Sequence, residues 1–334
     1  MSVTLKIDGE RFLLNGQAVF LLGASYYAGL GAAADVVERD FTELRRLGVN
    51  WVRVWCTWGA YGYDISAVDA RGAAGEPYLS RLVELCRQAD RLGLVVDVSF
   101  QRAVTADKAA ADKGLAGFAR MPWMQSPIAT HEDHLRAVAT VTEALRGAGN
   151  VYIDVSNERD LPHDLVVSFE DAGELIARVR QVDQHRLVTV SGIGDCAGED
   201  LRNYLSVAKV DFLAPHRHRG SDSPAQTLAV TQQLRREMVE LGRPVPIHYQ
   251  EPLRRDHMGW DPSVEDFLTD LDGAVRGGAA GWCFHNGFSR SADGCPRRSF
   301  DLRDGSLFDQ LDAVELAVLQ QAAGVVKSAS ALRT

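Results

Sequence analysis

Two glutamates each follow an apolar run of the chain. The run over residues 151–156 leads directly to Asn157 and Glu158, and the run over residues 245–249 leads to Glu251. Two carboxyl groups that face each other about 5 to 5.5 Å apart can cleave a glycosidic bond by double displacement, one as nucleophile and the other as proton donor. The sequence therefore indicates acid and nucleophile chemistry, provided that the fold brings the ends of the two runs together.

A single glutamate at the end of an apolar run is more often a solvated loop residue than a catalytic one. Two such glutamates, one preceded by an asparagine whose amide can hydrogen-bond a hydroxyl group, favour a functional pair. Strand alternation would turn Asp154 to the same side as Glu158, so an inward Glu158 implies a second, buried acid. Arg53, placed between strand-like hydrophobic residues, is the expected partner because a buried arginine must also be paired.

Strand-like and helix-like segments alternate along the chain. Apolar runs of strand length occur at residues 19–26, 50–55, 94–99, 151–156, 187–191, 210–215, 245–249 and 280–285. Segments with helical periodicity lie at residues 35–47, 78–92, 131–146, 165–182, 200–207, 224–241, 262–276 and 307–322. Nearly continuous apolar runs are typical of parallel strands buried on both faces. The alternation predicts an α/β fold, a closed (β/α)8 TIM barrel, in which the carboxyl ends of the fourth and seventh strands bring Glu158 and Glu251 to one mouth.

Glycines and turn residues support this organisation. Left-handed helix ends are expected at Gly48, Gly93, Gly242 and Gly277. No G-x-G-x-x-G motif follows the first run, which argues against an open dinucleotide-binding sheet. Residues 6–20, with Asn15-Gly16 as the turn, predict a short N-terminal β-hairpin, and we expect residues 1–18 to close the bottom of the barrel. One catalytic domain over residues 1–334 is the simplest organisation.

Composition and charge narrow the class of function. The chain has 334 residues, of which 46% are hydrophobic, so it can bury a large core. A formal charge of -9, from 36 basic and 45 acidic residues without a basic run, offers no footprint for nucleic acid. The sequence shows no signal core or bilayer-spanning run, and five widely spaced cysteines favour a reducing compartment. We therefore expect a soluble, cytoplasmic protein without nucleic-acid or membrane partners.

The chain resembles clan A glycoside hydrolases, and within them most closely the cellulase-like family 5 and its relatives. The similarity covers nearly the whole barrel, from residues 12–19 through residues 23–27 to the eighth run. The resemblance implies that Glu158 is the acid/base and that Asn157 touches the substrate hydroxyl next to the scissile bond. It also implies that Glu251 is the nucleophile.

Further positions of that family fall on residues around the same mouth. The resemblance implies that Arg53 keeps the nucleophile ionised, that Trp282 forms the floor of the sugar site, and that His216 contacts the sugar. Tyr26 stands at the end of the first run, and we expect it to point toward the mouth together with Trp282. The substrate implied is a carbohydrate.

Departures from the family pattern surround the reacting pair. Arg159 stands where a proline usually follows the Asn-Glu pair, and Ser99 stands where the third strand usually has a histidine. Residues 216–218 read His-Arg-His, so the tyrosine that usually contacts the nucleophile is missing. His218 and Tyr249 are the two candidates to replace it. These departures concern the family and the substrate, while the clan pattern is kept.

Aromatic and histidine residues suggest further roles. The aromatic residues that flank strand ends, where flat rings can stack on sugars, are Trp55, Trp58, Tyr61, Tyr63, Trp123, Trp260 and Phe288. We expect about half of them to pack loops only. His131, His134, His216, His218 and His285 could form a metal site, but the first run offers Ser-Tyr-Tyr instead of the His-x-His of metal-dependent barrels. No metal or cofactor is expected, and no Gly-x-Ser-x-Gly motif supports a serine nucleophile.

The interpretation that we favour is a retaining glycoside hydrolase that cleaves a β-glycosidic bond in an oligosaccharide or glycoside with two glutamates. A catalytically silent barrel that binds carbohydrate is the second hypothesis, and a metal-dependent barrel hydrolase is the third. The long segments 59–77 and 101–129 are expected to determine the sugar, the linkage and terminal or internal cleavage. The oligomeric state is left open.

Overall fold

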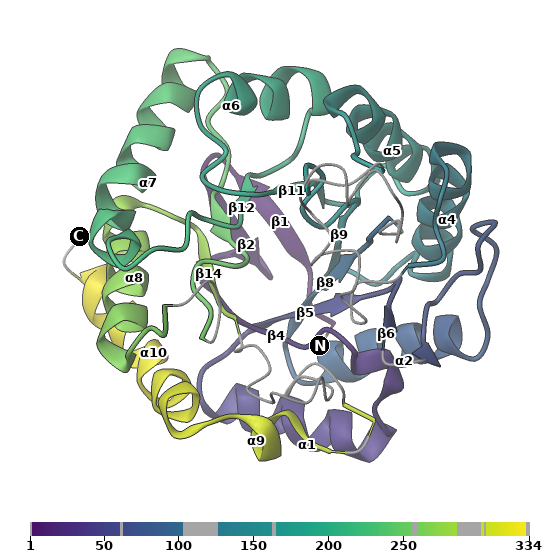
Figure 1. Ribbon diagram of the computed structural model, residues 1–334, viewed down its shortest axis with the longest axis horizontal. Coiled ribbons are helices and arrows are strands. Elements are labelled where there is room, and N and C mark those ends of the chain that lie inside the picture. Colours follow the sequence, from purple (N-terminus) through teal and green to yellow (C-terminus); the bar gives the residue numbers. More distant parts are fainter. Residues whose placement is uncertain are drawn as a thin grey trace.

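Parallel strands form a closed ring at the centre of the molecule (Figure 1). The computed structural model describes residues 2–60, 63–102, 126–161, 165–255, 260–285, 302–303 and 305–331. A 7-stranded parallel sheet has the order β10-β9-β8-β5-β4-β14-β13. These strands are β4 (Leu21–Ser25), β5 (Trp51–Trp55), β8 (Val95–Ser99), β9 (Val151–Asp154), β10 (Val188–Thr189), β13 (His248–Tyr249) and β14 (Gly281–Phe284).

The remaining gap in the ring is closed by the fifth and sixth predicted runs. β11 (Ser191–Gly192) continues the run that contains β10 and pairs in parallel with β12 (Ala214–Pro215). A parallel bridge between Leu213 and Ile247 then joins the sixth run to the seventh. The prediction of a (β/α)8 barrel is therefore confirmed.

Helices surround the ring of strands on all sides (Figure 1). They are η1 (Gly29–Gly31), α1 (Ala34–Arg46), α2 (Tyr78–Arg91), α4 (His131–Ala144), α5 (Phe169–Val182), α6 (Glu199–Asn203), η3 (Tyr204–Ala208, a π-helix), α7 (Ser223–Glu240), α8 (Val264–Gly277), α9 (Leu307–Gln310) and α10 (Ala313–Ala331). Each predicted helical segment overlaps at least one of them. The last predicted segment is divided into α9 and α10, because the backbone at Leu311 is extended.

Successive residues of each strand pack into two different hydrophobic cores. Trp51, Val95 and Tyr152 belong to one core inside the barrel, whereas their neighbours Val52 and Val96 belong to the larger core between strands and helices. This alternation follows from the two-residue period of a β-strand. It decides which side chain at a strand end reaches the mouth of the barrel and which one packs against a helix.

The N-terminal segment forms a small antiparallel sheet of β1 (Leu5–Asp8), β2 (Arg11–Leu14) and β3 (Gln17–Val19). The expected turn is present, since Asn15 and Gly16 have left-handed φ angles of 52° and 81°. Phe12 packs edge-on against Phe212 inside the barrel, with 5.1 Å between the ring centroids. A short hairpin, β6 (Gly59–Ala60) and β7 (Tyr63–Asp64), follows β5.

Glycine ends several helices as the sequence predicts. Left-handed φ angles occur at Gly48 (87°), Gly93 (74°) and Gly242 (70°). The fourth left-handed residue is Gly278, at 99°, and the expectation of Gly277 is wrong because α8 continues through it. A Cβ atom on Gly277 would lie 2.6 Å from Cβ of Thr231 in α7, so this glycine allows the two helices to pack closely.

Other features bear on the expected compartment and partners. Within the described residues, we find no helix with the length and apolar character needed to cross a bilayer. Cys56, Cys86, Cys196 and Cys283 are buried free thiols. Cys295 lies outside the described residues.

Candidate active site

The chain turns sharply after β9 and directs Glu158 across the mouth of the barrel. Asp154 ends the strand, and Glu158 has a left-handed backbone with a φ of 42°. Such a conformation costs a non-glycine residue roughly 1–3 kcal/mol and persists only where neighbouring structure holds it. The N–H of Glu158 donates to Oγ of Ser191 at 3.1 Å, and the N–H of Arg159 donates to the carbonyl of Ser191 at 3.1 Å. The adjacent strand therefore fixes the turn.

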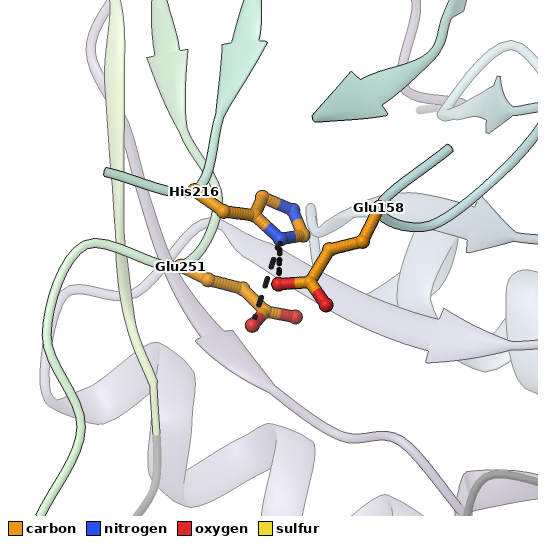
Figure 2. Close-up of side chains that lie close together, drawn as sticks. All are labelled: Glu158, His216 and Glu251. Atoms are coloured by element: carbon orange, nitrogen blue, oxygen red, sulfur yellow. Dashed lines mark hydrogen bonds and ion pairs between the residues drawn. The ribbon is translucent and has the colours of Figure 1, made fainter. Parts of the chain in front are cut away.

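Glu251 lies two residues beyond β13 and is 3% exposed. Figure 2 shows Glu158 and Glu251 extending toward each other on one side of the His216 ring. Nδ1 of His216 lies 3.0 Å from Oε1 of Glu158 and 3.6 Å from Oε2 of Glu251. An oxygen of each carboxyl group and a nitrogen of the ring all lie within 4.8 Å of one another. The structure thus brings three of the predicted site residues together.

Arg53 is fully buried beside Glu251 and binds four groups at once. Its Nη1 donates to Oε1 of Glu251 at 2.6 Å, and its Nη2 donates to Oδ2 of Asp154 at 3.1 Å. Nη2 also donates to Oδ1 of Asn157 at 2.8 Å, and Nε donates to Oγ of Ser99 at 2.9 Å. The expected pairing of Arg53 with Asp154 is therefore present. Ser99, at the family's histidine position, helps to hold the guanidinium group.

A polar layer lies beneath Arg53 inside the barrel. Oδ2 of Asp97 is 3.4 Å from Nε of Arg53 and accepts hydrogen bonds from Tyr152 at 2.9 Å and from Gln250 at 2.7 Å. Burial raises the pKa of Asp97 to about 7, although the charge of Arg53 opposes this rise. Asp97, itself hydrogen-bonded by Tyr152 and Gln250, thus helps to fix the guanidinium group of Arg53 from the inside of the barrel.

Two contacts of Glu251 come from residues outside the expected binding set. The hydroxyl group of Tyr27 lies 3.0 Å from Oε1 of Glu251 and also contacts the ring of His285. Nε2 of His285 lies 3.2 Å from Oε2 of Glu251. Strand alternation could have found both residues, because Ser25 and Cys283 point into the barrel and contact each other. Tyr27 and His285 stand two positions after them.

Arg219, between β12 and α7, also contacts both glutamates. Its Nη2 lies 2.7 Å from Oε2 of Glu251 and 3.8 Å from Oε1 of Glu158. Nε and Nη2 each donate to the backbone carbonyl of Glu251 at 3.2 Å. The side chain is 13% exposed and can be reached from solvent. No sequence pattern marked this loop residue. Arg254 interacts electrostatically with the same two glutamates.

Both glutamates are easier to ionise than an ordinary glutamate. Burial alone would raise the pKa of Glu251, but the His216 ring and the surrounding guanidinium groups hold that pKa well below its ordinary value. Burial also opposes ionisation of Glu158, yet the hydrogen bond from His216 outweighs it and lowers the pKa of Glu158. Both carboxyl groups are therefore charged at neutral pH. A proton donor needs a raised pKa, so the surroundings of Glu158 must change before it can hold a proton.

Two aromatic residues expected at the mouth point away from it. The hydroxyl group of Tyr26 donates to Oδ2 of Asp40 in α1 at 2.9 Å. Nε1 of Trp282 donates to Oδ2 of Asp270 in α8 at 2.7 Å. Both side chains are fully buried in the core between strands and helices. The expectation that they point toward the mouth is wrong, because Tyr26, directly after β4, and Trp282, in β14, are both turned outward.

Tyr249 and His218 were the candidates for the missing tyrosine. The hydroxyl group of Tyr249 hydrogen-bonds to Oγ1 of Thr231 in α7 at 2.7 Å, so this residue also faces outward, and its expected place at the site is wrong. His218 is exposed to solvent. The contact with Glu251 that one of them was expected to make comes from Tyr27.

Of the other family departures and strand-end aromatic residues, some lie near the mouth and others pack against helices or the core. Arg159 packs on α5, with its guanidinium carbon 3.5 Å from the centroid of the Phe169 ring, and so has a structural contact. Trp55 lies edge-on to Tyr27 at 5.2 Å, and Trp58 stacks on Tyr27 at 6.2 Å, which places both near the mouth. Trp260 is half-buried and packs against the main core. The structure does not describe Tyr61, Trp123, Phe288 or the side chain of Tyr63.

Glu158, His216 and Glu251 also form a set of possible metal ligands. A divalent cation there would meet two guanidinium groups, because Arg53 lies 2.6 Å from one oxygen of Glu251 and Arg219 lies 2.7 Å from the other. The electrostatics of this donor set therefore fit a metal poorly. His131 starts α4, and its Nε2 lies 2.8 Å from Glu174 at the molecular surface.

Solved glycoside hydrolases share this fold. The β-mannanase from Thermomonospora fusca is 15% identical with a TM-score of 0.61, and the match covers 98% of this chain and 97% of that chain. The β-mannanase from the blue mussel Mytilus edulis is 14% identical with a TM-score of 0.60 and covers 97% of both chains. A family 5 mannosidase from Rhizomucor miehei is 13% identical with a TM-score of 0.61 and covers 99% of both.

The similarity to known proteins is found in the fold and not in the sequence. No protein-family model and no curated protein sequence matches the chain. The fold is that of the cellulase-like family 5 barrels of clan A, as the resemblance in sequence implied.

Proposed function

We propose that the protein is a retaining β-glycoside hydrolase with Glu251 as nucleophile and Glu158 as acid/base. The observation that carries the proposal is the proximity of the two carboxyl groups, with one oxygen of each within 4.8 Å. Carboxyl groups about 5 to 5.5 Å apart suit a covalent glycosyl intermediate, whereas inverting enzymes keep about 6.5 to 9.5 Å open for a water molecule. The short gap therefore favours retention.

The surroundings of Glu251 are those that a nucleophile needs. Tyr27 and Arg53 contact Oε1, whereas Oε2 lies 3.6 Å from Nδ1 of His216, the ring nitrogen that also contacts Glu158. In the first step Oε2 bonds to the anomeric carbon while the bond to the leaving oxygen breaks and Glu158 gives that oxygen its proton. In the second step water transfers a proton to Glu158, attacks the same carbon and releases Glu251 as a carboxylate.

The role of Glu158 depends on a change in its pKa. In this structure the hydrogen bond from His216 favours the charged form, which cannot protonate a leaving group. This observation also favours the second hypothesis, a barrel that binds carbohydrate without cleaving it. Turnover of a substrate distinguishes the two, because only an enzyme releases the aglycone.

The neighbouring structures guide the choice of first substrates. The similar structures are β-mannanases and a mannosidase, so aryl β-mannosides and manno-oligosaccharides belong in the first panel beside aryl β-glucosides. The same panel should include glycosides with charged sugars, because the mouth contains several arginines.

The deciding experiment is chemical rescue of Glu251→Ala. The variant is expected to lose turnover of an aryl β-glycoside, since no carboxylate attacks the anomeric carbon. Azide should restore turnover and yield a glycosyl azide of inverted configuration, because a small anion then enters from the side of Glu251. Glu265→Ala, an exposed glutamate in the first turn of α8, is the matched control and should keep full activity. Undiminished turnover in Glu251→Ala would remove the nucleophile assignment.

A further inference from the structure

We infer that the substrate is an anionic glycoside whose carboxylate or phosphate group binds Arg219 next to the scissile bond. The inference rests on the proposed function, since it names the substrate class of the same site. It comes from the position of a guanidinium group that neither the nucleophile role nor the acid role requires. Guanidinium groups bind carboxylate and phosphate oxygens through paired, charge-assisted hydrogen bonds.

Arg219 lies where a bound sugar must be. Its Nη2 is 2.7 Å from Oε2 of Glu251 and 3.8 Å from Oε1 of Glu158, so it lies at the gap between the two reacting groups. The backbone carbonyl of Glu251 accepts hydrogen bonds from Nε and Nη2, which anchor the base of the guanidinium group. Within the part of the chain that the structure describes, Nη1 makes no hydrogen bond. That nitrogen is available to a ligand.

A neutral sugar replaces the contacts of Arg219 poorly. For Oε2 of Glu251 to attack a carbon atom, its hydrogen bond to Nη2 must lengthen or break. A sugar hydroxyl group would then give the guanidinium a weaker, uncharged partner. An anionic group gives it a partner of the same charge as the one it loses, and adds an attraction between opposite charges that a hydroxyl group lacks.

The charge on the glutamate pair changes in a way that an anionic group can offset. Both carboxyl groups are charged in the structure, whereas the reaction needs one of them to be neutral at each stage. Glu158 carries a proton before the first step, and Glu251 is an ester after it. Arg219 therefore faces one negative charge fewer throughout the reaction. An anionic group on the sugar supplies the missing charge.

The same group would help Glu158 to act as an acid. Arg219 is one of the charges that favour the ionised form of Glu158. An anion bound to Arg219 offsets that charge, so the pKa of Glu158 rises when the substrate binds. A neutral glycoside lacks this effect and leaves Glu158 ionised. Anionic substrates are therefore expected to have a higher kcat as well as a lower KM.

The test compares matched glycosides that differ only in charge. The substrates are 4-nitrophenyl β-glucoside, β-glucuronide and 6-phospho-β-glucoside, with β-mannoside and β-mannuronide as a second pair. At low salt, kcat/KM of the preferred anionic member should exceed that of its neutral partner about 10- to 100-fold, as expected for a hydrogen bond to a charged group. The glucuronide and the phosphate arms distinguish the two kinds of anion.

Variants assign the preference to one side chain. Arg219→Gln should reduce the anionic-to-neutral ratio of kcat/KM to near one, while Arg219→Lys should keep part of it, because lysine has the charge without the planar fork. Arg236→Gln removes an exposed arginine of α7 and is the matched control for the loss of one positive charge. Circular dichroism of each variant checks that the fold is kept.

Binding separates the failure of this inference from the failure of the proposed function. Non-hydrolysable aryl thioglycosides of the same sugars are titrated into the wild-type protein by calorimetry. Tighter binding of the thioglucuronide that depends on Arg219 supports the anionic ligand even if no glycoside is cleaved. Equal or tighter binding and turnover of the neutral sugars would overturn the inference and leave the glycosidase proposal intact. Absence of binding for both classes would overturn both proposals.

Discussion

The hydroxyl group of Tyr27 lies 3.0 Å from Oε1 of Glu251, although 224 positions separate the two residues in the chain. The preceding residue, Tyr26, points the opposite way and donates to Asp40 in α1. Both rings are fully buried. Adjacent tyrosines of equal size and burial therefore contact two different parts of the molecule, the pair of glutamates at the mouth and the core beneath the helices.

Tyr27→Phe is expected to reduce kcat/KM about 10- to 100-fold, because a hydrogen bond to a charged group contributes about 1.5–3 kcal/mol. The acid limb of the pH profile should move to higher pH, since Glu251 loses a donor that favours its charged form. Tyr26→Phe is the matched control. It should lower the free energy of unfolding and leave kcat/KM unchanged. Equal effects of the two variants on kcat/KM would contradict the assignment of Tyr27.

Much of the fold could be predicted from the sequence, because apolar runs and helical periodicity mark the barrel. Strand alternation, applied to the strand ends, would also have predicted the correct directions of the aromatic side chains. Tyr26 and Trp282 are one position away from the inward side chains of Ser25 and Cys283, whereas Tyr27 and His285 are two positions away. The resemblance to a family assigned Trp282 by residue type, and Tyr26 was expected at the mouth because it stands at a strand end, whereas the period of the strand assigns both by direction.

Two features of the site depend on geometry that local patterns do not encode. Glu158 reaches the mouth through a left-handed turn held by Ser191, and not through the alternation of β9. Arg219 is placed by a loop whose path depends on contacts with the backbone of Glu251. Such contacts join segments that are distant in the chain.

Glu158→Gln should slow substrates in proportion to how poor their leaving group is. An acid contributes about 10²–10⁴-fold when the leaving oxygen needs a proton. A 2,4-dinitrophenyl glycoside needs little protonation, so its first step should be nearly unaffected, whereas an alkyl glycoside should lose most of its turnover. The measurement is a plot of log kcat/KM against leaving-group pKa. A slope equal to that of the wild type would exclude Glu158 as the acid.

Trp282→Phe distinguishes a packing role from the sugar-site role that the family resemblance implied. The variant loses the hydrogen bond from Nε1 to the buried carboxyl group of Asp270. We expect the free energy of unfolding to fall by about 2–4 kcal/mol, since a buried acceptor is left without its donor and a cavity is formed. KM for an aryl glycoside should change less than about threefold, because Trp282 lies in the core between strands and helices and does not line the mouth where the substrate would bind. A large rise in KM at unchanged stability would instead support a role of Trp282 in binding the sugar.

His248 makes stability depend on pH at the centre of the barrel. The ring is fully buried, lies 4.4 Å from the centroid of Trp51, and has no hydrogen-bond partner for either nitrogen among the described residues. Burial lowers the pKa of His248 from 6.5 to about 3, and the charge of Arg53 adds to this effect. The unfolded chain takes up the proton first, so the stability that His248 contributes is complete above pH 6.5 and is lost as the pH falls toward 3.

The size of this pH dependence of stability follows from the shift in the pKa of His248. Stability should decrease by about 1.4 kcal/mol per pH unit in that window, or about 2 kcal/mol between pH 7 and pH 5. Urea unfolding of the wild type and of His248→Met at both pH values measures it, because methionine fills a similar space without titrating. The difference between the two pH values should shrink by that amount in His248→Met. His185→Gln, at an exposed histidine, should behave as the wild type. An unchanged pH dependence in His248→Met would mean that the folded protein takes up the proton on this ring as readily as the unfolded chain does, which would require a partner for the charged ring inside the barrel.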